Sequence, residues 1–218
     1  MTFDLGHDDS PPSLEALRLR LAALAEDDGG SNSIVVTLLE MLEQHDRQAA
    51  EHAFRVAEVA CAIGAHLRLP AAQLARLRLA ALLHDIGKLS LSDDVLNKPG
   101  PLSDGEWQQL RSHPEYGYQL IVAAVHPEVA ETVRDYCERP DGRGYPDGKQ
   151  GNQIPMMARI LLTADAYDAM QSARPYRPPM SFGETVQNLQ AGAGTEFDAE
   201  AVEALAIVAA KRGWSAAA

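Results

Sequence analysis

Cysteine is scarce in this 218-residue sequence, in which only Cys61 and Cys137 occur. Two widely separated cysteines do not form the dense disulfide framework of a small secreted protein, and they fit a reducing compartment better. Long apolar runs are also missing, since none approaches the ~20 residues that a membrane-spanning helix needs. The start of the chain shows no charged-then-apolar secretory leader. We therefore expect a cytoplasmic protein that does not enter the membrane.

Basic residues are outnumbered by acidic ones. The chain has 19 Lys and Arg against 31 Asp and Glu, which gives a formal net charge of -12. Such a chain has no broad basic face to offset phosphate repulsion, so we exclude bulk nucleic acid as a partner. A small anionic ligand is still compatible with this charge if a metal and a few cations gather in one pocket.

Apolar spacing and capping signals predict helices along nearly the whole chain. At this length, one helical domain with a sizeable core is the natural expectation. A long loop rich in Gly, Pro and Asp is predicted at 140–154. We therefore predict an all-α bundle. The expected helices lie near 13–25, from 33 onward, around His52, from 70 to the His84-Asp85 pair, and at 103–113, 114–124, 127–139, 155–171, 181–190 and 199–211.

The first 32 residues are predicted to form an extension with one short helix, ahead of a domain at 33–218. Leucines at positions 14, 17, 21 and 24 lie on one side of that helix. Such a stripe packs either on the parent domain or on a second copy of the chain, as a homodimer. Both interpretations stay open.

The segment His84-Asp85-Ile86-Gly87-Lys88 is the most informative stretch of the sequence. Imidazole and carboxylate are a ligand pair that suits Zn, Fe or Mn. Gly87 lets the backbone leave the helix directly after these ligands. Lys88 can then face an anionic group held by the metal. The segment predicts metal-assisted phosphate chemistry.

Three further residues on predicted helices carry groups that can bind a metal. His52 belongs to a helical stretch with an apolar stripe, and His113 follows a helix opened by a capping box. Asp165 shares a face with apolar residues, and a buried carboxylate without a partner is unfavourable, so a metal ion is a plausible partner. Asp168, one turn further on, is expected to be structural.

Taken in order, these segments resemble the HD superfamily of metal-dependent phosphohydrolases, and in particular its HD-GYP branch. The similarity runs from about residue 33 to about residue 208. The resemblance implies an all-helical fold, and active members of the branch are phosphodiesterases that open cyclic di-GMP. The matching segments are His52-Ala-Phe-Arg55, His84-Asp85-Ile-Gly-Lys88, Asn97-Lys-Pro-Gly100, His113-Pro-Glu, Asp141-Gly-Arg-Gly144-Tyr145-Pro146, Ala164-Asp165-Ala-Tyr-Asp168, Arg174-Pro-Tyr-Arg177 and Gly192 to Asp198.

The resemblance implies one or two divalent ions, Fe, Mn or Zn, and it also reveals a departure. The first metal site is implied to consist of His52, His84, Asp85 and Asp165. For the second site, the family usually has His-His-Glu where this chain reads Tyr136-Cys137-Glu138. Only His113 and the bridging Asp85 are left there. Cys137 is either a thiolate ligand or a small buried apolar side chain, and Tyr136 is a poor ligand.

The substrate implied by the resemblance is a cyclic dinucleotide or another small phosphoester. Asp85 and Lys88 are the expected catalytic residues, because the ion would activate water and Lys88 would polarise a phosphate oxygen. Arg174 and Arg177 are expected to donate to phosphate. Tyr145 belongs to the loop that, in the family, is associated with substrate access and with docking of signalling proteins.

Three functions therefore stay open for this chain. It is an active phosphohydrolase, impaired at the second metal site; or a catalytically inactive cyclic di-GMP receptor; or a protein-interaction module whose metal is structural. We favour the first, because the first-site ligands, Lys88 and both arginines are present.

Overall fold

The structure of the protein is a computed structural model that describes residues 31–45, 47–96, 98, 100–172 and 178–214. The helix expected near 13–25 lies outside these residues, and so do Arg174 and Arg177. The division of the chain into an extension at 1–32 and a domain at 33–218 therefore stays a prediction.

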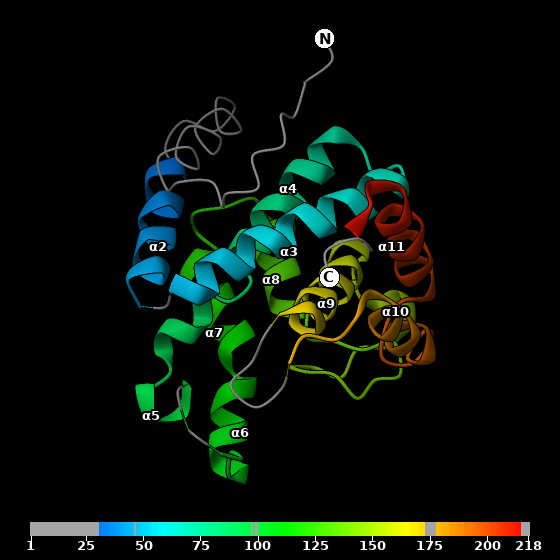
Figure 1. Cartoon of the computed structure of the whole chain (residues 1–218). Coiled ribbons are helices and arrows are strands. Elements are labelled where there is room, and N and C mark those ends of the chain that lie inside the picture. Colours follow the sequence, from blue (N-terminus) through cyan, green and yellow to red (C-terminus); the bar gives the residue numbers. More distant parts are fainter. Residues whose placement is uncertain (1–30, 46, 97, 99, 173–177, 215–218) are drawn as a thin grey trace.

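Within the described residues the chain is all-α, as predicted, and contains no β-strand (Figure 1). Backbone bridging is confined there to two isolated pairs, Asp141 with Gln150 and Ala193 with Phe197. No helix in this part of the chain combines the length and apolar character needed to cross a bilayer. The elements are α2 (Ser31–His45), α3 (Arg47–His66), α4 (Ala71–Leu83), η1 (Ile86–Ser90), α5 (Asp93–Leu96), α6 (Asp104–Arg111), α7 (His113–Ile121), α8 (Pro127–Asp135), η2 (Gly151–Gln153), α9 (Met156–Gln171), α10 (Phe182–Ala191) and α11 (Ala199–Arg212).

Helix α3 lies at the centre of the bundle and packs against α2, α4, α9 and α11 (Figure 1). The apolar stripe predicted for it is buried, with Ala53, Val56, Ala60 and Ile63 each 1% exposed or less. Burial of such a stripe is the main source of stability for a helix of this kind. Because α4 and α9 both pack on α3, residues at their inner faces meet near the middle of the molecule.

Capping boxes are present at the start of α6, as predicted for the helix ahead of His113, and at the start of α10. At the start of α6, Ser103 Oγ accepts the backbone N–H of Glu106, while the Glu106 carboxylate accepts the backbone N–H of Ser103. Ser181 and Glu184 make the same reciprocal pair at the start of α10. These bonds satisfy backbone donors that the first helical turn leaves without partners.

Helix α8 ends at Asp135, earlier than the predicted end at 139. The buried carboxylate of Glu138 accepts hydrogen bonds from the backbone N–H groups of Asp147, Gly148 and Lys149. The backbone N–H of Glu138 donates to the carbonyl of Asp135 at 2.9 Å, so the chain leaves α8 through a tight turn. The predicted loop at 140–154 is present and contains the single turn η2.

Gly87 allows η1 and α7 to approach closely. A Cβ atom built on Gly87 would lie 1.9 Å from the backbone oxygen of His113. No side chain fits in that space, so only glycine permits this contact. The contact places the first residue of α7, His113, next to the segment that carries Asp85.

Candidate metal centre

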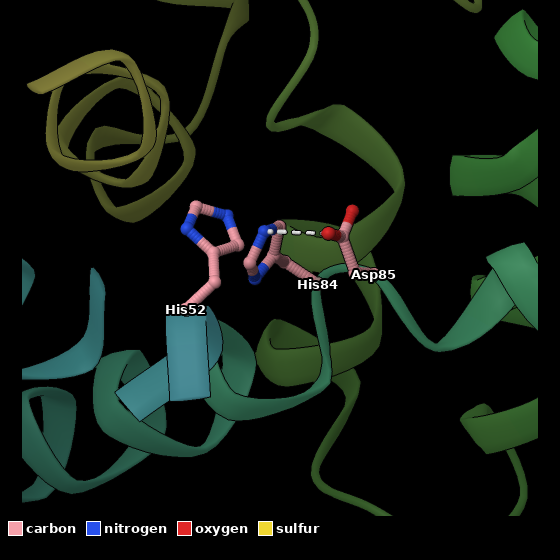
Figure 2. Close-up of side chains that lie close together, drawn as sticks. All are labelled: His52, His84 and Asp85. Carbon is pink, nitrogen blue, oxygen red and sulfur yellow. Dashed lines mark ion pairs between the residues drawn. The ribbon is translucent and has the colours of Figure 1, made fainter. Parts of the chain in front are cut away.

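His52, His84 and Asp85 converge from three elements (Figure 2). His52 lies on α3, His84 caps the end of α4, and Asp85 caps the start of η1. One ligand atom from each lies within 4.8 Å of the others. The two imidazole rings are 5.2 Å apart, between centroids, at an interplanar angle of 67°. Two imidazoles and a carboxylate are a donor set that binds divalent transition metals.

The buried ring of His84 has one nitrogen without a hydrogen-bond partner. His84 Nδ1 lies 2.7 Å from the carbonyl oxygen of Ala81, which can only accept, so Nδ1 carries the proton. In the neutral ring, Nε2 then carries a lone pair, and it makes no hydrogen bond within the described part of the chain. A buried polar atom without a partner is unfavourable, and a cation is the partner that suits this lone pair.

Asp165, on α9, lies beside His52 and His84 but is not among the three residues whose ligand atoms all lie within 4.8 Å of one another. Its Oδ1 lies 3.0 Å from His52 Nε2 and 4.0 Å from His84 Nε2. Burial lowers the pKa of His52, but hydrogen bonds to Asp165 and Asp168 outweigh it and raise the pKa to about 9. The proton on His52 Nε2 thus occupies a position between an imidazole and a carboxylate where a metal ion can replace it.

Asp168 and Arg55 hold His52 from the other side of its ring. His52 Nδ1 lies 2.7 Å from Asp168 Oδ2. Arg55 donates to both oxygens of Asp168, at 2.7 Å from Nε and 3.0 Å from Nη2. Asp168 was expected to be structural, and its contact with a candidate ligand was missed. The sequence does contain a signal for this contact. His52 and Arg55 are three residues apart on α3, and Asp165 and Asp168 are three residues apart on α9. Because these two helices pack together, the two pairs can face each other.

Lys88 pairs with Asp85. Its Nζ donates to Asp85 Oδ2 at 2.6 Å, and the Asp85 carboxylate is 2% exposed. Burial raises the pKa of Asp85, but His84 and Lys88 outweigh that effect and hold the pKa far below its usual range. Asp85 is therefore a carboxylate that can bind a cation.

His113 and Tyr136 lie on the opposite side of Asp85. Tyr136 is buried, and its hydroxyl oxygen lies 2.6 Å from His113 Nε2 and 3.2 Å from Asp85 Oδ1. His113 Nε2 lies 3.8 Å from the same carboxylate oxygen. Burial lowers the pKa of His113 to about 4, so its ring is neutral.

Cys137 lies outside the cluster formed by His52, His84 and Asp85. Burial raises the pKa of its thiol to about 12, and the thiol interacts with the hydroxyl of Tyr145. A protonated thiol is a weak ligand, so the arrangement favours the interpretation of Cys137 as a small apolar side chain, which here is half-buried. The Tyr145 ring is also covered by the guanidinium of Arg111, at 5.6 Å from its centroid.

The loop that carries Tyr145 is fastened to α8. Besides the Glu138 contacts, Arg134 donates to Asp147, and Lys149 Nζ donates to Asp135 Oδ2 at 2.6 Å. These bonds fix the loop beside the candidate metal centre.

The structure thus brings most of the residues expected in the site together and leaves two outside its description. Arg174 and Arg177, the expected phosphate donors, lie outside the described residues. Those that gather around Asp85 are His52, His84, Lys88, His113 and Asp165, with Cys137 and Tyr145 on the side of the loop.

Comparison with known proteins gives a consistent result. A family model described as "HD domain" matches residues 37–201. The chain is 35% identical over 185 residues to 3'3'-cGAMP-specific phosphodiesterase 3 of Vibrio cholerae, covering 84% of this chain and 40% of that protein. It is 34% identical over 188 residues to the cyclic di-GMP phosphodiesterase response regulator RpfG of Xanthomonas campestris, covering 85% and 50%. The chain therefore spans half the length of these relatives or less.

Two solved structures have a similar fold. One is a cyclic GMP-AMP specific phosphodiesterase of V. cholerae, with a TM-score of 0.64 at 22% identity, covering 83% of this chain and 48% of that one. The other is Bd1817, described as an HDG"Y"P protein, from Bdellovibrio bacteriovorus. Its TM-score is 0.63 at 15% identity, covering 89% and 78%. At these identities the likeness concerns the fold.

Proposed function

Since this chain belongs to the HD domain family, we propose that it is a metal-dependent phosphodiesterase that hydrolyses a cyclic dinucleotide. The observation that carries the proposal is the lone pair of His84 Nε2, which is buried beside Asp85 and Asp165 and has no hydrogen-bond partner within the described residues. Relatives at about this distance in sequence are named phosphodiesterases of cyclic di-GMP or 3'3'-cGAMP, which supports this substrate class.

The donor set fits a divalent ion such as Fe, Mn or Zn, held by His52, His84, Asp85 and Asp165. When bound, such an ion supplies Lewis acidity and makes water a stronger nucleophile near neutral pH. The chain's own contribution is orientation. The Ala81 carbonyl fixes the tautomer of His84, and Asp168 fixes that of His52, so that both Nε2 atoms face the acids.

Lys88 has the role of contacting substrate phosphate. Its ammonium donates to Asp85 Oδ2 at 2.6 Å, so it lies beside the candidate metal ligands. A phosphate oxygen is a strong acceptor for an ammonium donor. Its charge would offset the negative charge that develops on the phosphate oxygens as water adds to phosphorus and the ester P–O bond breaks, with the bond's electron pair leaving on the ester oxygen.

A second candidate function is a receptor that binds a cyclic dinucleotide without cutting it. The observation that favours it is the presence of Tyr136 and Cys137 where the HD-GYP pattern has two histidines. In either function, the loop around Tyr145 is the surface through which a signalling protein would dock. The leucine stripe within residues 1–32 would pack on the parent domain or, in a homodimer, on a second copy of the chain.

The test is hydrolysis of cyclic di-GMP and of 3'3'-cGAMP by the purified chain, after chelation and reloading with Mn²⁺, Fe²⁺ or Zn²⁺. We expect a linear dinucleotide product that disappears in His84→Ala and is retained in His66→Ala, since His66 is an exposed histidine at the end of α3. Calorimetry with the same nucleotides separates the two functions. Binding without product, under all three metals, supports the receptor; neither binding nor product refutes both.

A further inference from the structure

Tyr136 is wedged between the two buried histidines on either side of Asp85. The residue is 3% exposed. Its ring meets His84 edge-on at a centroid distance of 5.1 Å and His113 at 5.9 Å. Its hydroxyl oxygen lies 2.6 Å from His113 Nε2 and 3.2 Å from Asp85 Oδ1. The phenol therefore contacts the only two groups that the sequence retains for a second metal.

His84 and His113 are held alike but differ at Nε2. Each ring places Nδ1 against the carbonyl of the residue three positions earlier, Ala81 at 2.7 Å and Leu110 at 2.6 Å. Both rings thus carry a proton on Nδ1 and a lone pair on Nε2 when neutral, which is the form that binds a metal. The lone pair of His84 has no partner within the described residues, whereas that of His113 faces the Tyr136 hydroxyl, whose single hydrogen lies between His113 Nε2 and Asp85 Oδ1.

The two oxygens of Asp85 are divided in the same way. Oδ2 lies 3.5 Å from His84 Nε2 and accepts from Lys88 Nζ. Oδ1 faces the Tyr136 hydroxyl and His113. A carboxylate that bridges two ions through its two oxygens needs Oδ1 free for the second ion. Here Oδ2 is directed to the first site, where Lys88 also donates to it, and Oδ1 is covered by the Tyr136 hydroxyl.

We infer that this site holds one divalent ion and that Tyr136 is a positioning residue, which replaces a second ion by binding His113 and Asp85. The inference deepens the proposed metal-dependent function and rests on it. A neutral phenol is a poor ligand for these ions, while its hydroxyl is a good hydrogen-bond donor to an imidazole lone pair. The consequence is a mononuclear centre in which Asp85 is a terminal ligand.

The experiment measures metal stoichiometry in the full chain, stripped with chelator and titrated with Mn²⁺ by calorimetry, followed by elemental analysis after gel filtration. We expect one equivalent of Mn²⁺ in the wild type, with the electron paramagnetic resonance spectrum of an isolated ion. Tyr136→Phe should keep one equivalent but bind it about 10-fold more weakly, because Asp85 and His113 lose their partner. Tyr116→Phe, at an exposed tyrosine on α7, is the matched control and should bind as the wild type does.

A double variant tests whether Tyr136 is what excludes the second ion. Tyr136→His with Cys137→His should bind two equivalents and give the spectrum of a coupled pair. Two equivalents in the wild type would overturn the inference, and so would one equivalent in the double variant with an unchanged circular dichroism spectrum. If the double variant does not fold, Tyr136→Phe decides, since unchanged Mn²⁺ affinity there refutes the positioning role.

These outcomes separate the inference from the proposed function. One equivalent of Mn²⁺ with no hydrolysis of either cyclic dinucleotide removes the proposed phosphodiesterase activity and leaves the mononuclear site. Hydrolysis by a protein that holds two equivalents of Mn²⁺ supports the phosphodiesterase activity and refutes the mononuclear site.

Discussion

Asp168 Oδ2 lies 2.7 Å from His52 Nδ1, on the side of the imidazole that faces away from Asp165. This pairing places the proton on Nδ1 and leaves Nε2 for a cation. A carboxylate in this position also raises the basicity of the ligating nitrogen, and partners of this kind are worth about 10–100-fold in metal affinity.

Asp168→Asn should therefore weaken Mn²⁺ binding by about 10–100-fold, because the amide carries no charge and can present a donor to Nδ1. The measurement is a calorimetric Mn²⁺ titration. Glu203→Gln, at an exposed acid on α11, removes the same charge far from His52 and should leave the affinity unchanged. Equal affinity in Asp168→Asn and wild type would show that Asp168 only holds α9 to α3.

Removal of the metal should lower the thermal stability of the chain. A ligand present at 100 times its Kd stabilises the native state by about 2.7 kcal/mol. At about 2–4 °C per kcal/mol for a domain of this size, chelation should lower Tm by about 5–10 °C. Differential scanning calorimetry with and without chelator gives the shift directly.

His84→Ala is the variant that checks this interpretation. It removes the nitrogen that has no partner, so its Tm should no longer respond to chelator, whereas His66→Ala should respond as the wild type does. A full chelator response in His84→Ala would mean that the stabilising ion binds elsewhere.

Glu138→Gln should destabilise the protein by about 1–3 kcal/mol, since the amide has one acceptor oxygen and leaves a backbone N–H of the loop without its partner. The wild-type carboxylate accepts from three backbone groups of the loop, at 2.6, 3.0 and 3.0 Å. Urea unfolding gives the free energy, and hydrogen exchange at residues 147–149 should accelerate. Glu131→Gln, an exposed position on α8, is the control and should change the free energy of unfolding by less than about 0.5 kcal/mol.

Two glycine substitutions should have opposite effects. Gly87→Ala forces a Cβ against the backbone of α7 and should destabilise by about 1–3 kcal/mol or more. Gly105→Ala, in α6, meets nothing within 4 Å and should stabilise by about 0.4–1 kcal/mol. Metal affinity should fall only in Gly87→Ala, because the displaced α7 carries His113, which binds the Tyr136 hydroxyl beside Asp85. If both alanines behave alike, the close approach of η1 and α7 does not position the site.

Local patterns in the sequence predict the features that depend on local chemistry. The stripe of α3, the capping boxes of α6 and α10 and the loop after α8 each follow from residues a few positions apart. Asp168 was assigned a structural role only, because its partners lie 113 and 116 residues away along the chain. The early end of α8 was missed for a related reason, since the contacts of Glu138 depend on the path of a later loop.

Local sequence also does not predict that the Nε2 atoms of His84 and His113 have different partners. Both follow a helix and precede a segment that packs inward, so their sequence contexts look alike. Only the folded chain brings the Tyr136 hydroxyl to one of them, and this depends on how α7 and α8 pack together.

The carbonyls of Ala81 and Leu110 each hold an imidazole before any ion arrives. Folding therefore removes the rotational freedom of these side chains, and binding need not remove it again. A site prepared in this way should show little change in side-chain conformation between its empty and loaded states, and fast capture of metal.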